Sequence, residues 1–323
     1  MKLSEAKCNN ALTGSRLSTT YTPIAVFVGG TSGIGRQTAE LLAQYTNGNV
    51  HIILVARGRD AAEKILEGMV RPLDGRKVLR VFIQCDVALM KNAEAAVAEI
   101  QALLQANQLP QKINFLFLSA GYASFSDRRN DTEEGIDHQL VLRYYHRFKF
   151  IRETLPLLHA AKDVGEDAKV VSCLGAGAKW PWVPKDGDFG YKKRKNGPGF
   201  HAPLVSAVYG DLAVEGFASH NPGISFTHMN PWFVRTQQFN NKRQISPTKW
   251  YAKFLNPIIV FFWSFFSLSE EESAEYFLYA LLHGDAGAHW RDNRAKEIGF
   301  RVNGVDKEAF WRHSMEETRR RTV

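Results

Sequence analysis

Three glycines near the start of the chain have the spacing of a turn that can hold phosphate groups. Gly29, Gly33 and Gly35 form a G-x-x-x-G-x-G pattern. The apolar segment 23–30 is typical of a short buried strand, and the segment 31–45 is typical of a helix. Glycine lets backbone N–H groups approach a pyrophosphate closely, and the start of a helix favours negative charge. The pattern therefore predicts a dinucleotide site built from a strand, a tight turn and a helix.

An arginine stands where an acidic residue would favour NAD(H). The second strand is expected over 50–60, and in NAD-specific folds an acidic residue near the end of this strand binds the ribose 2′-hydroxyl. This sequence has Arg57 there, with Arg59 close by and Arg36 just after the turn. A guanidinium attracts a 2′-phosphate and can bind it through two parallel hydrogen bonds. The position therefore favours NADP(H), and the alternative is an ordinary surface arginine.

Composition and charge are those of a globular protein with one sizeable core. The chain has 323 residues, 45% of them hydrophobic, and a formal net charge of +8. This charge fits a phosphate-bearing ligand or simply a basic surface. The basic residues are dispersed, so nucleic acid is not an expected partner. The three cysteines are too scattered for a disulfide framework and form no C-x-x-C, so no metal site is expected.

No segment of the sequence predicts membrane insertion or secretion. The first 22 residues lack the apolar core of a secretory signal. The longest apolar run, 258–268, is shorter than the roughly 20 residues that span a bilayer. We therefore expect a cytoplasmic protein, and weak contact of this run with a membrane surface is an alternative.

The elements that must position the glycine turn alternate between strand and helix. Further strands are expected at 78–87 and 113–121, with an amphipathic helix at 92–107 between them. This alternation predicts a parallel sheet with helices on both faces. The polar stretch 289–304 is typical of a surface hairpin.

With these elements, the chain resembles the short-chain dehydrogenase/reductase family over residues 23–240. The resemblance rests on VGGTSGIG, CDV, LSAG, KVVSCLGAG and FTHMNPWFVRT, which occur in family order. It is strongest to fungal members, many of which belong to the natural-product pathways of secondary metabolism. The resemblance implies that the cofactor is bound by Gly29, Thr31, Ser32, Gly33, Ile34, Gly35, Arg36, Arg57, Asp86, Val87, Ser119, Ala120 and Gly121.

The resemblance also implies the organisation of the chain. We expect one α/β domain, a Rossmann-like doubly wound parallel sheet with a lid and a C-terminal helical extension. Residues 1–22 would form an N-terminal extension, 23–240 the core, and 241–323 the lid and C-terminal extension of the same domain. Family analogy implies a homo-oligomer.

All four catalytic residues of the family are replaced in this sequence. The resemblance places Arg143 at the asparagine that holds a proton-relay water, and Gly175 at the serine that holds the carbonyl group. The catalytic tyrosine falls on Pro203 and its lysine on Ala207, because SAVYGDL matches the family's S-K-x-x-N-D-L. The glycine beside the nicotinamide becomes Trp232. The usual acid–base chemistry is therefore not expected.

The sequence offers Arg143, His201 and Tyr191 as replacement catalytic residues. Tyr191 and Lys195 form a literal Y-x-x-x-K, but the segment 196–199 (NGPG) would break the helix that this pair requires. We interpret Tyr191 as a loop residue, with supply of the acid from that loop as the alternative. His201 precedes the altered helix and is expected to point into the cleft, while a structural histidine is the alternative. Arg143 would hold an anionic group or polarise a carbonyl.

Aromatic residues predict an apolar pocket for a bulky hydrophobic small molecule. The pocket candidates are Trp180, Trp182, Trp232 and Phe233, and the aromatic segment 249–268 lies where the family places its substrate lid. Ordinary core, a dimer interface and a membrane contact are the alternatives.

Three functions follow from this pattern. The first is an atypical NADP(H)-dependent oxidoreductase, because an acid is dispensable when the hydride acceptor is already activated, as in an iminium ion or a conjugated system. The second is a non-redox cyclase or isomerase that uses the old cavity with one polar group. The third is a pseudoenzyme that binds a dinucleotide.

Overall fold

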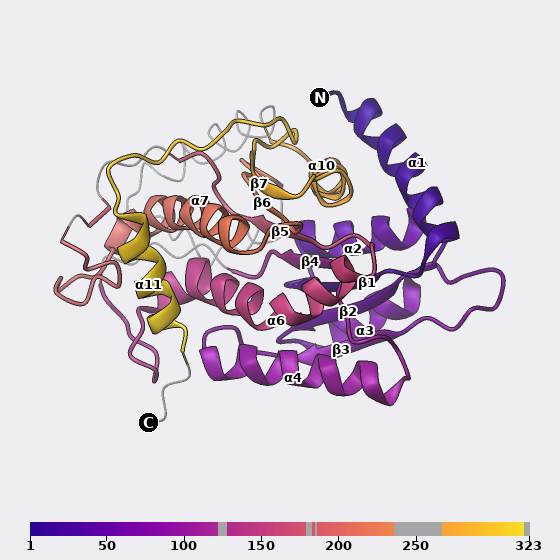
Figure 1. Ribbon diagram of the computed structural model, residues 1–323, viewed down its shortest axis with the longest axis horizontal. Helices are drawn as coiled ribbons and strands as arrows, with labels where there is room; N and C mark the ends of the chain where they lie inside the picture. Colours follow the sequence, from indigo (N-terminus) through magenta and orange to yellow (C-terminus); the bar gives the residue numbers. More distant parts are fainter. Residues whose placement is uncertain (122–127, 179–182, 185, 236–266, 320–323) are drawn as a thin grey trace, which may run out of the picture.

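The computed structural model describes residues 1–121, 128–178, 183–184, 186–235 and 267–319 (Figure 1). Seven strands form one parallel sheet in the order β3-β2-β1-β4-β5-β6-β7. The strands are β1 (Ile24–Val28), β2 (His51–Ala56), β3 (Arg80–Gln84), β4 (Phe115–Leu118), β5 (Lys169–Cys173), β6 (Ser225–Met229) and β7 (Gly287–Arg291). The predicted doubly wound α/β class is confirmed, and the order reverses between β1 and β4, where such sheets bind ligands.

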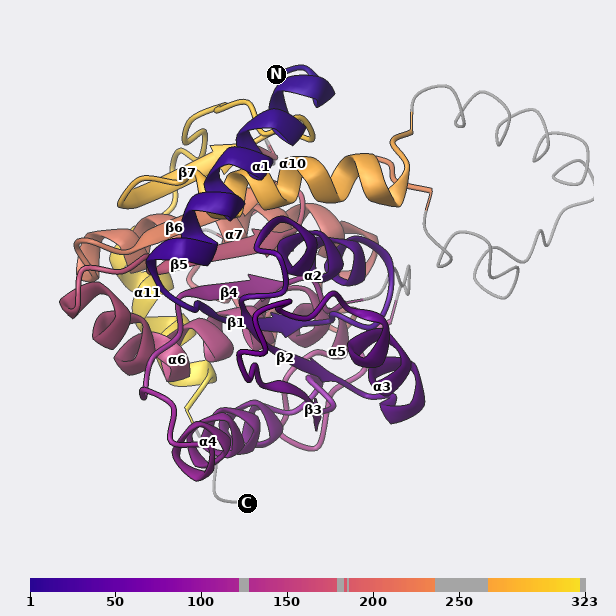
Figure 2. The same ribbon diagram turned by 90° about the vertical axis from the view of Figure 1, so that its right-hand side faces the viewer.

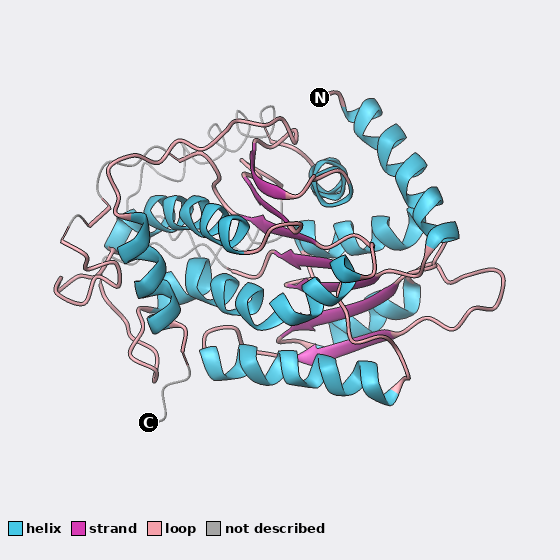
Figure 3. Cartoon of the chain, viewed as in Figure 1, coloured by secondary structure: helices cyan, strands magenta, loops and turns pink. Residues whose placement is uncertain are grey.

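Helices cover both faces of the sheet (Figures 2 and 3). In chain order they are α1 (Leu3–Thr20), α2 (Gly33–Tyr45), α3 (Arg59–Gly68), α4 (Met90–Ala106), the short α5 (His138–Leu140), α6 (His146–Asp163), α7 (Ala202–His220), α10 (Glu270–Leu282) and α11 (Lys307–Glu317). A π-helix, Val141–Tyr145, joins α5 to α6, and a 3-10 helix, Gly199–His201, precedes α7. Among the described residues, no helix is long and apolar enough to cross a membrane.

Alternate residues of each buried strand face two separate cores. On β1, Val26 and Val28 pack with apolar residues of α4, α6 and α7, whereas Ala25 and Phe27 pack with those of α2 and α10. This two-sided burial explains why β1 is apolar throughout, without the alternation of a strand that has one face in water.

The N-terminal helix packs against a helix from the C-terminal part of the chain. Helix α1 packs against α10, and the Asn10 side chain donates hydrogen bonds to the Glu275 carbonyl oxygen (2.9 Å) and carboxylate (2.8 Å). The hairpin prediction for 289–304 was incomplete, because Gly287–Arg291 pairs parallel with β6 before the chain turns back to form an isolated bridge between Arg291 and Glu297.

His51 makes the fold sensitive to acid. Its Nδ1 accepts a hydrogen bond from the Leu79 N–H (2.9 Å), and burial, with the nearby charges of Arg80 and Lys112, lowers its pKa to about 4. An unfolded histidine has a pKa of about 6.5, so between these values the unfolded chain binds a proton that the fold does not. The contribution of His51 to stability is therefore expected to be full above about pH 6.5 and to be lost as the pH drops, by ~3 kcal/mol in all.

The variant His51→Asn keeps a hydrogen-bond acceptor but cannot take up the proton. Urea unfolding at pH 7.5 and pH 5 is expected to show a loss of stability about 2 kcal/mol smaller in the variant than in the native chain. His146, whose pKa burial lowers to about 3, retains its own contribution to the loss in both proteins. An equal loss in both proteins would show that His51 does not cause it.

Candidate active site

A cavity of about 790 Å³ opens at the carboxyl ends of the central strands. Its size is that of a small-molecule site, and it lies where the strand order reverses. All the residues predicted to bind a cofactor line it except Arg36: Gly29, Thr31, Ser32, Gly33, Ile34, Gly35, Arg57, Asp86, Val87, Ser119, Ala120 and Gly121. The structure brings these residues together, and their contact with a cofactor stays a prediction.

The glycine turn packs against the end of β4 with no room for side chains. Gly29 has a φ of +97°, and a Cβ built on it would lie 2.4 Å from the backbone nitrogen of Ala120. A Cβ on Gly35 would lie 2.2 Å from Oγ of Ser119. Helix α2 begins at Gly33, and the side chain of its N-cap residue, Ser32, makes no capping hydrogen bond. Its first N–H groups are therefore left for an anion in the cavity.

The arginines near the turn differ in their partners. Arg36 pairs with Glu40 at 2.8 Å. Arg59 pairs with Glu63 at 3.2 Å, and its guanidinium also lies 5.2 Å from the ring centre of Phe82. Arg57 is exposed at the mouth of the cavity and makes no hydrogen bond or ion pair with any residue that the structure describes. Its guanidinium is therefore the one best placed to bind a ligand phosphate.

The replaced catalytic positions lie against one another. A Cβ built on Gly175 would lie 3.2 Å from Cβ of Ala207, tighter than an ordinary contact. Ala207 is buried, and Pro203 lies in the first turn of α7. Neither a hydroxyl nor an ammonium group stands at these positions. Because the helix approaches so closely, a serine at 175 could enter only if its neighbours shifted.

Arg143 lies on the π-helix, one of the rare segments that are frequent at functional sites. Its side chain is buried, and its carbonyl oxygen accepts a hydrogen bond from Nε of Arg147 (2.9 Å). Arg143 is not among the residues that line the cavity, but its neighbours Leu142 and His138 are. The structure therefore puts Arg143 beside the cavity, and its catalytic role stays a prediction.

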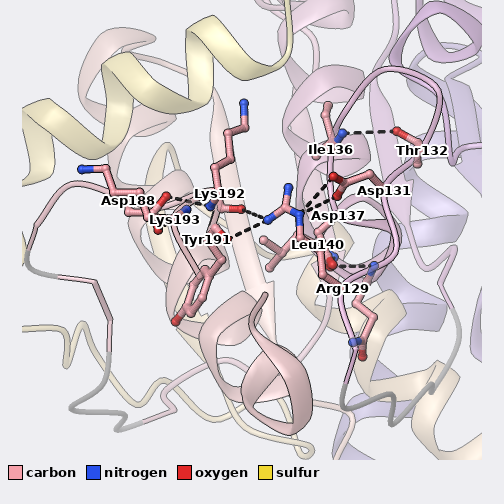
Figure 4. Close-up of polar contacts among 12 residues, drawn as sticks. Arg129, Asp131, Thr132, Ile136, Asp137, Leu140, Asp188, Tyr191, Lys192 and Lys193 are labelled. Atoms are coloured by element: carbon pink, nitrogen blue, oxygen red, sulfur yellow. Dashed lines mark hydrogen bonds and ion pairs between the residues drawn. The ribbon is translucent and has the colours of Figure 1, made fainter. Parts of the chain in front are cut away.

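Tyr191 lies in a loop, as interpreted from the sequence. The residues after it form turns instead of a helix, and Arg129 clamps the loop by donating to the Tyr191 carbonyl oxygen (2.7 Å; Figure 4). The ring points away from Arg129, and burial raises its pKa to about 12. A catalytic acid needs a pKa near the working pH, and Tyr191 does not line the described cavity wall. Both observations weigh against the alternative that the loop supplies the acid.

His201 and the aromatic pocket candidates do not all lie at the cavity. His201 ends the 3-10 helix, is exposed, and is not one of the described residues that line the cavity. Trp180 and Trp182 lie outside the described residues, as does most of the segment predicted to form the lid. Of the two remaining pocket candidates, Trp232 lines the cavity, whereas Phe233 is not one of the described residues that line it.

Trp232 stands at the cavity in a strained backbone conformation. Its φ is +53°, a left-handed value that costs a non-glycine residue about 1–2 kcal/mol, and its side chain is 59% exposed. The N–H of Trp232 donates to Oδ1 of Asn230 (2.8 Å), and its ring meets Phe233 edge-on at 5.3 Å. A backbone conformation that favours glycine thus carries a large aromatic ring here.

Several lining residues were missed from the sequence, including Cys85, Leu142, Cys173 and Pro231. Burial raises the pKa of the Cys173 thiol to about 12, so the thiol stays protonated at neutral pH. Most of these residues lie within the predicted motifs or directly beside them, and this proximity in the sequence could have indicated that they line the cavity.

Comparisons with known proteins agree with this geometry. A family model described as short chain dehydrogenase matches residues 23–182. An oxidoreductase of Emericella nidulans is 33% identical over 258 residues, which are 80% of this chain and 71% of that protein. Oxidoreductase andH of Emericella variicolor is 30% identical over 259 residues, 79% of this chain and 68% of that protein.

Solved structures share the fold at low sequence identity. NADPH-bound carbonyl reductase from chicken fatty liver has a TM-score of 0.56 at 14% identity, covering 86% of this chain and 99% of that one. L-sorbose reductase from Gluconobacter frateurii, in complex with NADPH and L-sorbose, has a TM-score of 0.56 at 18% identity, covering 86% and 98%.

Proposed function

Because this chain belongs to the short-chain dehydrogenase family, we propose that it is an oxidoreductase that binds NADP(H) in the cavity and acts without the serine–tyrosine–lysine chemistry of its family. Its substrate would be a bulky hydrophobic metabolite. The observation that carries the proposal is the contrast between two halves of one site. The glycine turn fits closely against the end of β4, whereas Gly175 and Ala207 put no acid–base group at the family's serine and lysine positions.

The residues of the cavity fit a phosphorylated dinucleotide. The uncapped start of α2 would bind the pyrophosphate, and Arg57 would bind the 2′-phosphate. Asp86 and Val87 would contact the adenine end. Relatives described as oxidoreductases and fold neighbours in complex with NADPH support this assignment.

The residues around the cavity limit which substrates can accept a hydride. When bound, the reduced nicotinamide supplies a hydride. With no tyrosine acid at the usual position, the acceptor must already be electron-poor, as an iminium ion or a conjugated carbonyl is. Trp232 would wall the apolar side of the site and exclude water from it.

A panel of acceptors tests this proposal. NADPH oxidation, followed at 25 °C by absorbance, is expected with cyclic iminium ions and hydrophobic enones, and not with the matching saturated ketones. Equal rates with saturated ketones would mean that an unrecognised acid acts in the site. If the chain binds NADPH but oxidises it with neither class of acceptor, the result would favour a non-redox function.

Arg143 is expected to matter most among the candidate catalytic residues. Arg143→Met should lower kcat/KM for an enone acceptor by about tenfold or more, because a cation beside the cavity stabilises the negative charge that develops on the enone oxygen. Tyr191→Phe and His201→Ala should change it by less than about threefold. A silent Arg143→Met in a variant of unchanged Tm would remove Arg143 from the mechanism.

A non-redox cyclase or isomerase is the second candidate, and Trp232 is the observation that favours it. The ring lies in the cavity where the family keeps glycine beside the nicotinamide. If Trp232 blocks the nicotinamide, Trp232→Gly should tighten NADPH binding by about tenfold. The redox proposal expects unchanged or weaker binding in the same titration.

A further inference from the structure

Arg147 carries a buried positive charge directly behind the wall of the cavity. It lies in the first turn of α6 and is 5% exposed. Its guanidinium donates to the carbonyl oxygens of Leu118 (2.5 Å), Ala120 (2.7 Å) and Arg143 (2.9 Å). A Cβ built on Gly121 would lie 3.5 Å from Nη2 of Arg147. Since Ala120 and Gly121 line the cavity, only this thin layer of backbone separates the charge from a ligand.

No carboxylate of the described chain neutralises this charge. The three acceptors of Arg147 are backbone carbonyl groups, and burial and the like-charged Arg143 both lower its pKa. Lys149, two residues further along the same helix and also buried, shows the contrast. It pairs with Glu94 at 3.2 Å and Glu153 at 2.8 Å.

The charge persists at neutral pH. Burial lowers the pKa of Arg147, but only to about 10. The acidic residue that lines the described wall, Asp86, is at the end of the cavity that also holds Arg57, beyond β3. The opposite end, beside β4 and β5, is therefore electropositive. The charge of Arg147 acts through a low-dielectric wall, where screening by water and salt is weak.

We propose that Arg147 makes the cavity select the reduced cofactor, and so makes this chain work as a reductase. The inference rests on the proposed function, because it requires a nicotinamide at this end. The oxidised ring carries a positive charge and the reduced ring is neutral, so a fixed cation behind the wall repels only the oxidised form. At the effective dielectric constant of about 20 that describes protein sites, such a pair changes binding by about tenfold or more.

Two variants of the full chain separate charge from hydrogen bonding. Arg147→Gln removes the charge and keeps N–H donors for the carbonyl groups, whereas Arg147→Lys keeps the charge with a different set of donors. Each protein is titrated with NADPH and with NADP+ by calorimetry. The native chain should bind NADPH at least about tenfold more tightly than NADP+. Arg147→Gln should bring the ratio of the two Kd values toward one, and Arg147→Lys should hold it within about threefold of the native value.

The outcomes distinguish this inference from the function on which it rests. A native ratio below about three, or a native ratio that Arg147→Gln leaves unchanged, overturns the inference while the cofactor assignment stands. Failure of the native chain to bind either cofactor overturns both. A purely structural role would lower the Tm of both variants and leave the ratio alone. Where a variant does not fold, a native ratio below about three still overturns the inference.

Discussion

Arg57→Ala is expected to weaken NADPH binding by about 10- to 100-fold and to leave NADH binding within about threefold. A charge-assisted hydrogen bond to a phosphate is worth about 1.5–3 kcal/mol, and each 1.4 kcal/mol is a tenfold change in Kd. NADH lacks the 2′-phosphate, so its binding does not depend on this interaction with Arg57. Nicotinamide fluorescence measures both affinities in one preparation.

Arg59→Ala is the matched control for this substitution. Arg59 lies two residues away but already pairs with Glu63 and stacks on Phe82. Its removal should change NADPH affinity by less than about threefold. If the two variants lose affinity equally, the effect comes from the general positive charge of this edge, and the specific role of Arg57 is wrong.

Gly29→Ala is expected to have the largest effect on stability and to abolish NADPH binding. The residue sits at φ +97°, and the new Cβ would meet the backbone nitrogen of Ala120 at 2.4 Å, where no side chain can move aside. The left-handed conformation alone costs about 1–2 kcal/mol, and the shift of the turn away from β4 adds to it. Thermal unfolding should show a fall in Tm of many degrees.

Gly58→Ala provides the comparison, because Gly58 also lines the cavity. Its φ is −102°, and a Cβ on it would meet nothing within 4 Å. This variant should keep its Tm within a few degrees and keep its NADPH affinity. A stable, NADPH-binding Gly29→Ala would mean that the close contact between the turn and β4 is not required for the site.

Local patterns were enough to predict the sheet and the glycine turn. The strands around the site are apolar on both faces, and glycines follow β1 where a turn must approach the end of β4. These features depend on residues near one another in the chain. The same is true of Arg57, which follows directly after β2.

Features that depend on distant contacts could not be predicted. The π-helix that carries Arg143 is held by C-terminal residues, since the Tyr145 hydroxyl meets Nε2 of His313 at 2.7 Å and the Tyr144 hydroxyl meets Oγ of Ser314 at 2.7 Å. The spacing of these residues in the sequence does not predict that they form hydrogen bonds with one another. The buried charge of Arg147 was missed for the same reason, because its partners are carbonyl groups that only the fold brings together.

The central claim is that this chain keeps a working dinucleotide site while its family's acid–base residues are gone. Titration of the purified chain with NADPH and NADH, followed by nicotinamide fluorescence, tests it most directly. The account predicts saturable binding of NADPH, at least about tenfold tighter than that of NADH. Binding of neither cofactor would mean that the glycine turn is a relic, and would contradict the account.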